Sequence, residues 1–231
     1  MDSKTAHKPP FTQPRLFGPE TTSSGTAELF PAIWNAAEDL SNPIPSVRKL
    51  ALECLEYTGA ARISPLVSYL IATRLNDPDL ELRSQVVRIL GEALAPDAQG
   101  NIAPEAVTTQ LTYYLSDMRT RQIFSLIQVL VHNPELAPQV IRILNACLFA
   151  GNHLIEMANS RKMSLEIRRK AIWLIGQVGY LEAIPALEHL QIRMETRISG
   201  QQSMPFAPPL GVDDSDLLPD VKVALVTLRS P

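Results

Sequence analysis

The chain has few cysteines, glycines and aromatic residues, and it has no long apolar run. Aromatic residues make up 6% of its 231 residues, and there are 10 glycines and two cysteines, Cys54 and Cys147. Both cysteines stand in apolar patterns with helical spacing, so we expect small buried side chains in a reducing compartment. No stretch approaches the roughly 18 apolar residues of a membrane helix, and the N-terminus lacks the apolar core of a signal peptide. These absences predict a cytoplasmic protein with no membrane span.

The charge balance lacks a basic excess. Lysine and arginine number 21 against 24 aspartates and glutamates, which gives a formal net charge of -3. Proteins that bind nucleic acid draw most of their affinity from neutralising phosphates and usually carry a clear excess of basic residues. The composition therefore argues against nucleic acid as a partner.

The sequence also lacks the constellations that carry out catalysis. No Cys-x-x-Cys, His-Glu-x-x-His, Gly-x-Ser-x-Gly or glycine-rich phosphate loop occurs. His153 and Glu156 have the spacing of one helix face, but they stand without further ligands. Asp213, Asp214 and Asp216 lie in a proline-rich loop, where we expect solvated carboxylates. We therefore expect no catalytic residue, no metal, no cofactor and no enzymatic activity.

Internal repetition is the most informative feature that is present. The stretch 79–94, DLELRSQVVRILGEAL, matches 164–179, SLEIRRKAIWLIGQVG, in its apolar positions, in Arg83 and Arg168 and in Gly91 and Gly176. Arginine, lysine or threonine takes the arginine position in five segments, at Arg48, Arg83, Thr120, Arg168 and Lys222. Tandem units of this length are typical of helical repeats that stack on one another. The sequence therefore predicts an all-α chain of about five helical pairs.

Proline, glycine and capping residues place the boundaries. A proline-rich segment at 1–25 is expected to be a disordered tail, 26–231 the repeat domain, and 198–217 a proline-rich, acidic loop insertion. Ser64, Asp79 and Ser164 are the expected N-caps, and Gly59 the expected left-handed C-terminal residue. The expected helices span 27–40, 45–58, 64–75, 79–94, 104–116, 119–131, 136–161 with a break near residue 151, 164–179, 181–196 and 219–229.

Several segments resemble HEAT repeats. PSVRKLALECLEYTG, LELRSQVVRILGEAL and LEIRRKAIWLIGQVG resemble the second helix of the repeat, and YLEAIPALEHL and ARISPLVSYLIATRL resemble the first. The likeness extends over about 27–230 and is nearest to short bacterial repeats related to phycobilisome-lyase HEAT-like proteins. It implies a right-handed α-α superhelix, an armadillo-like solenoid whose second helices line a concave face. It also implies an arginine that reaches an aspartate in an interhelical turn, for which Arg83 and Asp77 are the candidates.

Trp173 is the candidate binding residue. The residues at the equivalent position of the other repeats are polar, which places Trp173 on the solvent side of the second helices. A tryptophan ringed by Arg88, Arg121 and Arg169 has the makeup of an interface anchor. Alternatively, the tail or the 198–217 loop covers Trp173, or it packs into the core. The same register predicts a stripe of solvent-facing residues along the concave side of the second helices. This stripe comprises Lys49, Glu53, Tyr57, Ser84, Arg88, Glu92, Arg121, Ser125, Arg169, Trp173 and Gln177.

These observations favour a non-enzymatic scaffold or adaptor that binds a partner protein on its concave face. Two other classes stay open. The likeness to phycobilisome-lyase repeats allows a bilin lyase-like or tetrapyrrole-binding protein, although it concerns the repeat and no catalytic residue. HEAT-like alkylpurine DNA glycosylases are similar in length and helices, but the acidic balance and the lack of an aspartate on the stripe argue against that activity.

Overall fold

A computed structural model describes residues 24–202 and 214–230, and in these ranges the ordered elements are helices, with no strand. The all-α prediction is confirmed for this part of the chain. Residues 1–23, 203–213 and 231 lie outside the described residues, and they include most of the predicted tail and loop.

The α-helices are α1 (Ser24–Asp39), α2 (Pro45–Tyr57), α3 (Ala60–Ile63), α4 (Pro65–Ala72), α5 (Leu80–Ala93), α6 (Glu105–Ser116), α7 (Thr120–His132), α8 (Ala137–Asn145), α9 (Ala150–Asn159), α10 (Leu165–Val178), α11 (Ile184–Gln202) and α12 (Leu218–Arg229). Short 3-10 turns complete the order as η1 (Thr73–Asn76), η2 (Pro134–Leu136), η3 (Leu181–Ala183) and η4 (Asp214–Leu217).

The predicted helix starts at the caps are confirmed. In each case a side-chain oxygen accepts a hydrogen bond from the backbone N–H three residues later, which satisfies a donor that the first helical turn leaves open. The pairs are Ser64 with Val67 at 3.3 Å, Asp79 with Leu82 at 3.1 Å and Ser164 with Ile167 at 3.4 Å. Gly59 has the expected positive φ, 63°, at the end of α2.

Three boundaries differ from the prediction. The break expected near Gly151 falls at 146–149, and Gly151 lies inside α9, where the ring of Tyr180 packs against it. Helix α11 continues to Gln202 instead of ending at 196. Helix α1 begins at Ser24, so Pro31 stands inside the helix and not in its first turn. Pro31 is exposed, so its ring meets solvent, although it still removes one backbone donor from the helix.

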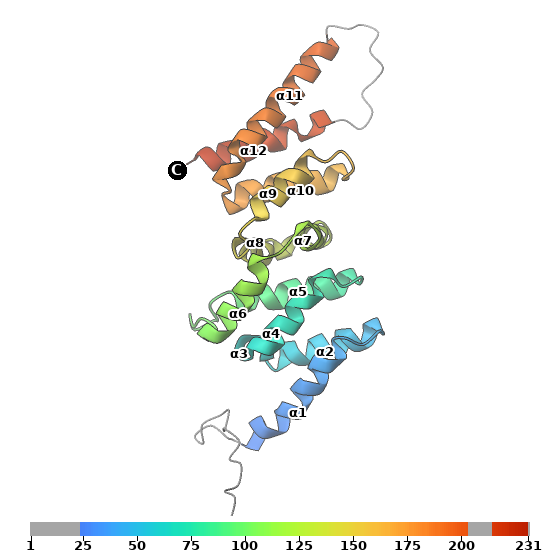
Figure 1. The fold of residues 1–231 in the computed structure, drawn as a ribbon, viewed down its shortest axis with the longest axis vertical. Helices are drawn as coiled ribbons and strands as arrows, with labels where there is room; N and C mark the ends of the chain where they lie inside the picture. The colour runs from blue at the N-terminus through green and yellow to red at the C-terminus, as the bar shows by residue number, and fades with distance from the viewer. Residues whose placement is uncertain (1–23, 203–213, 231) are drawn as a thin grey trace, which may run out of the picture.

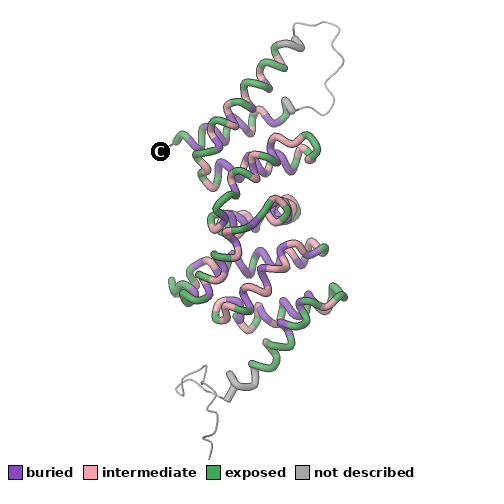
Figure 2. The backbone as a smooth tube through the Cα atoms, viewed as in Figure 1, coloured by how far each residue is buried: buried purple, intermediate pink, exposed green. Residues whose placement is uncertain are grey.

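The layers of helices follow one another along the long axis of the molecule from α1 to α12, with α6 at the side, beside α4 and α5 (Figure 1). Helices α1 and α2, α9 and α10, and α11 and α12 pack directly as neighbours in sequence. Contacts between successive layers join α2 to α5, α5 to α7 and α8, these two to α10, and α10 to α12. Buried residues accordingly run through the whole stack and do not gather at one centre (Figure 2). Each layer buries its apolar face only against its neighbours, as in a linear array.

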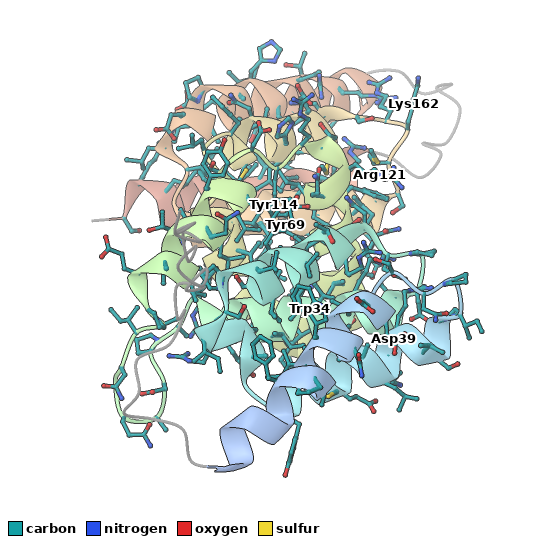
Figure 3. The ribbon with its side chains drawn as sticks, turned by 60° about the horizontal axis from the view of Figure 1, so that its bottom comes forward. Trp34, Asp39, Tyr69, Tyr114, Arg121 and Lys162 are labelled. Carbon is teal, nitrogen blue, oxygen red and sulfur yellow. The ribbon has the colours of Figure 1, made fainter. Side chains whose placement is uncertain are left out.

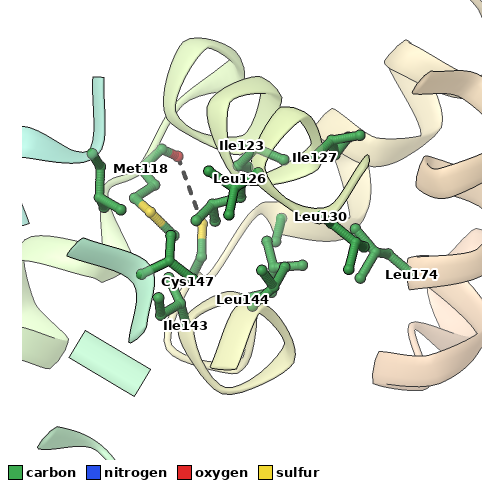
Figure 4. Packing of buried hydrophobic residues seen from close by; sticks show 14 of the residues in the cluster. Met118, Ile123, Leu126, Ile127, Leu130, Ile143, Leu144, Cys147 and Leu174 are labelled. Atoms are coloured by element: carbon green, nitrogen blue, oxygen red, sulfur yellow. Dashed lines mark hydrogen bonds between the residues drawn. The ribbon is translucent and has the colours of Figure 1, made fainter. Parts of the chain in front are cut away.

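The third predicted pair, 104–116 with 119–131, does not form. Helix α6 packs instead on α4, where Tyr114 meets Tyr69 edge to face with 5.4 Å between the ring centroids. Helix α7 turns back through η2 into α8, and the end of α8 returns to the start of α7. There Cys147 Sγ lies 3.6 Å from the carbonyl oxygen of Met118 (Figure 4). Helix α7 therefore packs between α5 and α10 and also contacts α8 and α9, and α6 is an additional helix on the side of the stack.

Arg62 holds the long connection between α5 and α6. Its Nη1 donates to the carbonyl oxygens of Glu92 and Ala95, and its Nη2 donates to that of Asn101, each at 2.8 Å. Within the same loop, Asp97 Oδ1 accepts from the backbone N–H of Asn101 at 2.8 Å. This bond is the largest cause of the lowered pKa of Asp97. One guanidinium thus satisfies carbonyls at the end of α5 and in the loop after it.

We expect the change Arg62→Met to loosen this loop. Hydrogen bonds from a charged donor contribute about 1.5–3 kcal/mol each, but partial exposure and alternative water partners reduce the net loss here to about 1–2 kcal/mol. Limited proteolysis should cut within 96–103 faster in the variant, and urea unfolding should give the stability change. Arg74→Met is the matched control, because the Nε of Arg74 bonds only to the adjacent Thr73 hydroxyl. Equal rates of cutting in both variants would contradict the role of Arg62 in holding this loop.

Candidate functional site

Trp173 lies on α10 with one side against the core and the other open. The helix starts at the Ser164 cap and buries Ile167, Ala171 and Leu174, and the indole of Trp173 packs, partly buried, beside that face. The Nζ of Lys170, one turn earlier, lies 5.8 Å from the centroid of the indole ring. An exposed cation over an indole contributes about 0.5–1 kcal/mol. The ring therefore has a fixed support and an accessible surface.

Arg169 stands beside Trp173 on α10 and is held by the last helix. Its Nε donates to Asp220 Oδ2 at 2.8 Å, and its Nη2 donates to the carbonyl oxygen of Asp216 at 3.4 Å. Both partners come from the start of α12 and the turn before it. The guanidinium is exposed yet positioned, so the structure places one of the three predicted arginines next to Trp173.

Arg88 does not belong to the surroundings of Trp173, contrary to the prediction. Helices α7 and α8 lie between α5, which carries Arg88, and α10 (Figure 1). Arg88 instead pairs with Glu56 of α2, with 3.0 Å between Nε and Oε1, and Glu56 also accepts from Gln85 at 3.0 Å. The register already placed the third unit, 119–131, between the units of Arg88 and Trp173, and α7, which is this unit, separates the two residues.

The remaining stripe residues divide into exposed and buried ones. Arg121 is exposed in the first turn of α7, a helix that contacts α10. Ser84 and Ser125, expected to face solvent, are buried: their hydroxyls donate to the Leu80 carbonyl at 2.9 Å and to Asn76 Oδ1 at 3.0 Å. A serine satisfied in this way fits a core position, so polarity alone misplaced both. The exposed members are Lys49, Glu53, Tyr57, Glu92 and Gln177.

The aspartate of the interhelical turn pairs with a different arginine from the one expected. Asp77 is buried and accepts from Arg48 Nε and Nη2, both at 2.8 Å, while Arg48 Nη1 donates to the carbonyls of Asn42 and Pro43. Arg83 donates from Nη1 to Gln128 at 2.7 Å, and burial lowers its pKa against the opposing field of Asp77 and Asp79. The arginine thus reaches the aspartate of the next unit, which joins α2 to the turn before α5.

The acid–base side chains contribute interhelical contacts. His153 Nδ1 lies 2.9 Å from the Thr120 hydroxyl and 3.7 Å from Glu156 Oε2, so it links α9 to α7. Among the described residues no group of three or more histidines, cysteines, aspartates or glutamates could hold a metal ion. Asp213 and Asp214 belong to the part of the chain whose side chains are not described.

Sequence reasoning missed three features of the surface. The partners of the arginines, Glu56 and Asp220, come from neighbouring layers and depend on the packing. Lys170 could have been found, because a residue three positions before Trp173 lies on the same side of a helix. Trp34 could also have been found: it is 48% exposed on α1, four residues after another aromatic residue, Phe30.

Comparison with known proteins adds no assignment. No protein-family model, no curated protein and no solved structure matches the chain. None of the helices in 24–202 and 214–230 is both long and apolar enough to cross a membrane.

Proposed function

We propose that this chain is a non-enzymatic scaffold or adaptor, a short HEAT-like superhelix that binds a partner protein at the surface around Trp173. The observation that carries the proposal is the state of the indole, which is supported by the core and by Lys170 but keeps an open side. Among the described residues the fully buried core positions are aliphatic or sulfur-containing, so a tryptophan adds little to this packing that leucine would not supply. As a binding anchor it is among the most effective residues.

The charged residues around Trp173 support the same proposal. Arg169 is already held by Asp220 and Asp216, so binding a partner does not require its side chain to be ordered first. Ordering a long free side chain at an interface costs about 0.5–1.5 kcal/mol. Arg121 and Lys170 add positive charge from α7 and α10. The expected partner surface presents an apolar group to the indole and carboxylates to the surrounding cations.

Affinity capture from the native cell tests this proposal when the intact chain is compared with a Trp173→Ala variant. Loss of a central anchor costs about 2 kcal/mol or more, so the affinity for the partner should fall about thirtyfold or more. Tyr57→Ala is the matched control, because Tyr57 is 91% exposed on α2, at the far side of the stack from α10. A partner captured equally well by Trp173→Ala would contradict the site, and the absence of any captured partner would contradict the adaptor.

A further inference from the structure

The last layer of the stack carries apolar side chains on its outer face. Two ion pairs join α11 to α12, and on each helix they stand seven residues apart. The pairs are Glu188 with Arg229 and Glu195 with Lys222. Ile192 and Val226 each stand four residues after a paired residue, so they lie on the same sides of their helices as the pairs. They therefore lie between the two pairs, and they are 61% and 65% exposed.

This apolar surface points away from the stack. Residues two apart lie on nearly opposite sides of a helix, because each residue advances the helix by about 100°. Ala224, two residues before Val226, packs against α10, where a Cβ added to Gly176 would lie 3.2 Å from Cα of Ala224. Helices α11 and α12 form one end of the molecule, and α1 and α2 form the other (Figure 1). We call the surface of Ile192 and Val226 the C-terminal end face.

The first layer has a similar outer face on α2. Arg48 bonds to Asp77 in the turn before α5, so this side of α2 faces the stack. Leu50, two residues later, lies on the opposite side of the helix and is 64% exposed. Val47 and Cys54 lie beside Leu50 on the same side of α2, and both are only partly buried. These three residues form the N-terminal end face, at the end of the molecule that comes forward in Figure 3.

We propose that the C-terminal end face of one chain packs on the N-terminal end face of a second copy. Inside the stack, a layer contacts the layer before it through one side and the layer after it through another, as α10 contacts α7 and α8 and also α12. The two end faces are the two halves of this contact, and among the described residues no further layer covers them. A second copy joined head to tail continues the stack. Because the contact uses two different surfaces, it need not close on itself.

The charges of the two end layers support a head-to-tail contact. Helices α1 and α2 carry five acidic and two basic residues, a net charge of -3, and α11 and α12 carry three acidic and four basic ones, a net charge of +1. Asp39, the last residue of α1, is exposed at the N-terminal end of the molecule (Figure 3). Contact between unlike ends brings opposite net charges together, whereas two first layers would repel each other. Added salt should therefore weaken the contact.

The size of the end layers sets the strength expected of this contact. Helix α11 has 19 residues, so the last layer is about 28 Å long and, at two helix diameters, about 20 Å wide. Each copy then covers about 560 Å², or about 1,100 Å² in total, just below the roughly 1,200–2,000 Å² of stable interfaces. We therefore expect a reversible association with a dissociation constant on the order of 100 μM.

Sedimentation equilibrium of the full chain tests the inference without any partner protein. Between about 10 μM and about 1 mM, the average mass of the intact protein should rise from the monomer mass of 25.5 kDa to beyond twice that value. Val226→Glu and Leu50→Glu should each remain monomeric, because each places an unpaired carboxylate in the contact. Tyr113→Glu is the matched control, because Tyr113 is 77% exposed on α6 at the side of the stack, and this variant should associate like the intact protein.

Mixing the two end-face variants tests which ends meet. Val226→Glu keeps an intact N-terminal end face and Leu50→Glu an intact C-terminal one, so an equimolar mixture should form a dimer and grow no further. This dimer would also show that both variants are folded. An intact protein or a mixture that stays monomeric at about 1 mM, or a single variant that still dimerises, would overturn the inference. None of these changes involves the surface around Trp173, so this inference and the proposed function succeed or fail separately.

Discussion

Replacing Asp77 by alanine is expected to lower the free energy of unfolding by about 3–5 kcal/mol, the range for removing one partner of a buried ion pair. Arg48 and Asp77 are 6% and 7% exposed, and two bonds of 2.8 Å join them. Without the carboxylate, the Arg48 guanidinium keeps only the carbonyls of Asn42 and Pro43 and remains charged inside the stack. The pair also joins α2 to the turn before α5, so its loss separates two layers.

Urea unfolding of three variants measures this effect. Asp77→Ala should be much less stable than Arg83→Met, because Arg83 is only partly buried and bonds to Gln128. Adding Arg48→Met to Asp77→Ala should recover part of the loss, since the double change removes the unpaired charge. A loss below about 1 kcal/mol for Asp77→Ala, as for an exposed pair, would contradict the buried pairing. A larger loss in Arg83→Met would restore Arg83 as the partner of Asp77.

The change Gly91→Ala is expected to destabilise the protein by about 1–3 kcal/mol, as for overpacking in a core. A Cβ on Gly91 would lie 2.4 Å from Cβ and 2.8 Å from Cα of Gln139, so that the backbone of α8 would have to move. In an isolated helix the same change would be favourable by about 1 kcal/mol. The sign of the measured effect therefore reports directly on the packing of α8 against α5.

Gly176→Ala is the matched control for this prediction. Gly176 takes the same place in the repeat pattern, but its added Cβ would lie 3.2 Å from Cα of Ala224. A small movement of α12 relieves a contact of this length. Thermal unfolding of the two variants should show a clearly larger loss for Gly91→Ala. A gain in stability from Gly91→Ala would mean that α8 does not approach α5 as the structure shows.

The features of the fold that could be predicted were those that depend on a few neighbouring residues. Ser64, Asp79 and Ser164 cap the helices that they were expected to cap, because the acceptor and the donor lie three residues apart. The packing of α6 depends on distant residues. Tyr114 meets Tyr69 across 45 residues of chain, and no local pattern encodes which apolar face finds which. The assignment of α7 to the wrong partner followed from treating α6 as a member of the repeat.

In the candidate site too, contacts between neighbouring residues could be predicted and contacts between distant residues could not. Trp173 and Arg169 are neighbours on one helix, and their proximity followed from helical spacing. Arg88 was assigned to the same surface although the repeat register itself placed a unit, α7, between α5 and α10, and a stripe that crosses three layers does not bring its ends together. Ser125 was misplaced because a hydroxyl bonded to Asn76 is as well satisfied in the interior as in water.

Hydrogen–deuterium exchange of the chain, alone and bound to its captured partner, tests the central claim most directly. The proposal predicts that binding slows exchange along α10, around 169–177, and in the first turn of α7, while α2 is unchanged. Slower exchange confined to α1, α3 and α4, with α10 unaffected, would contradict the proposal that the surface around Trp173 holds the partner.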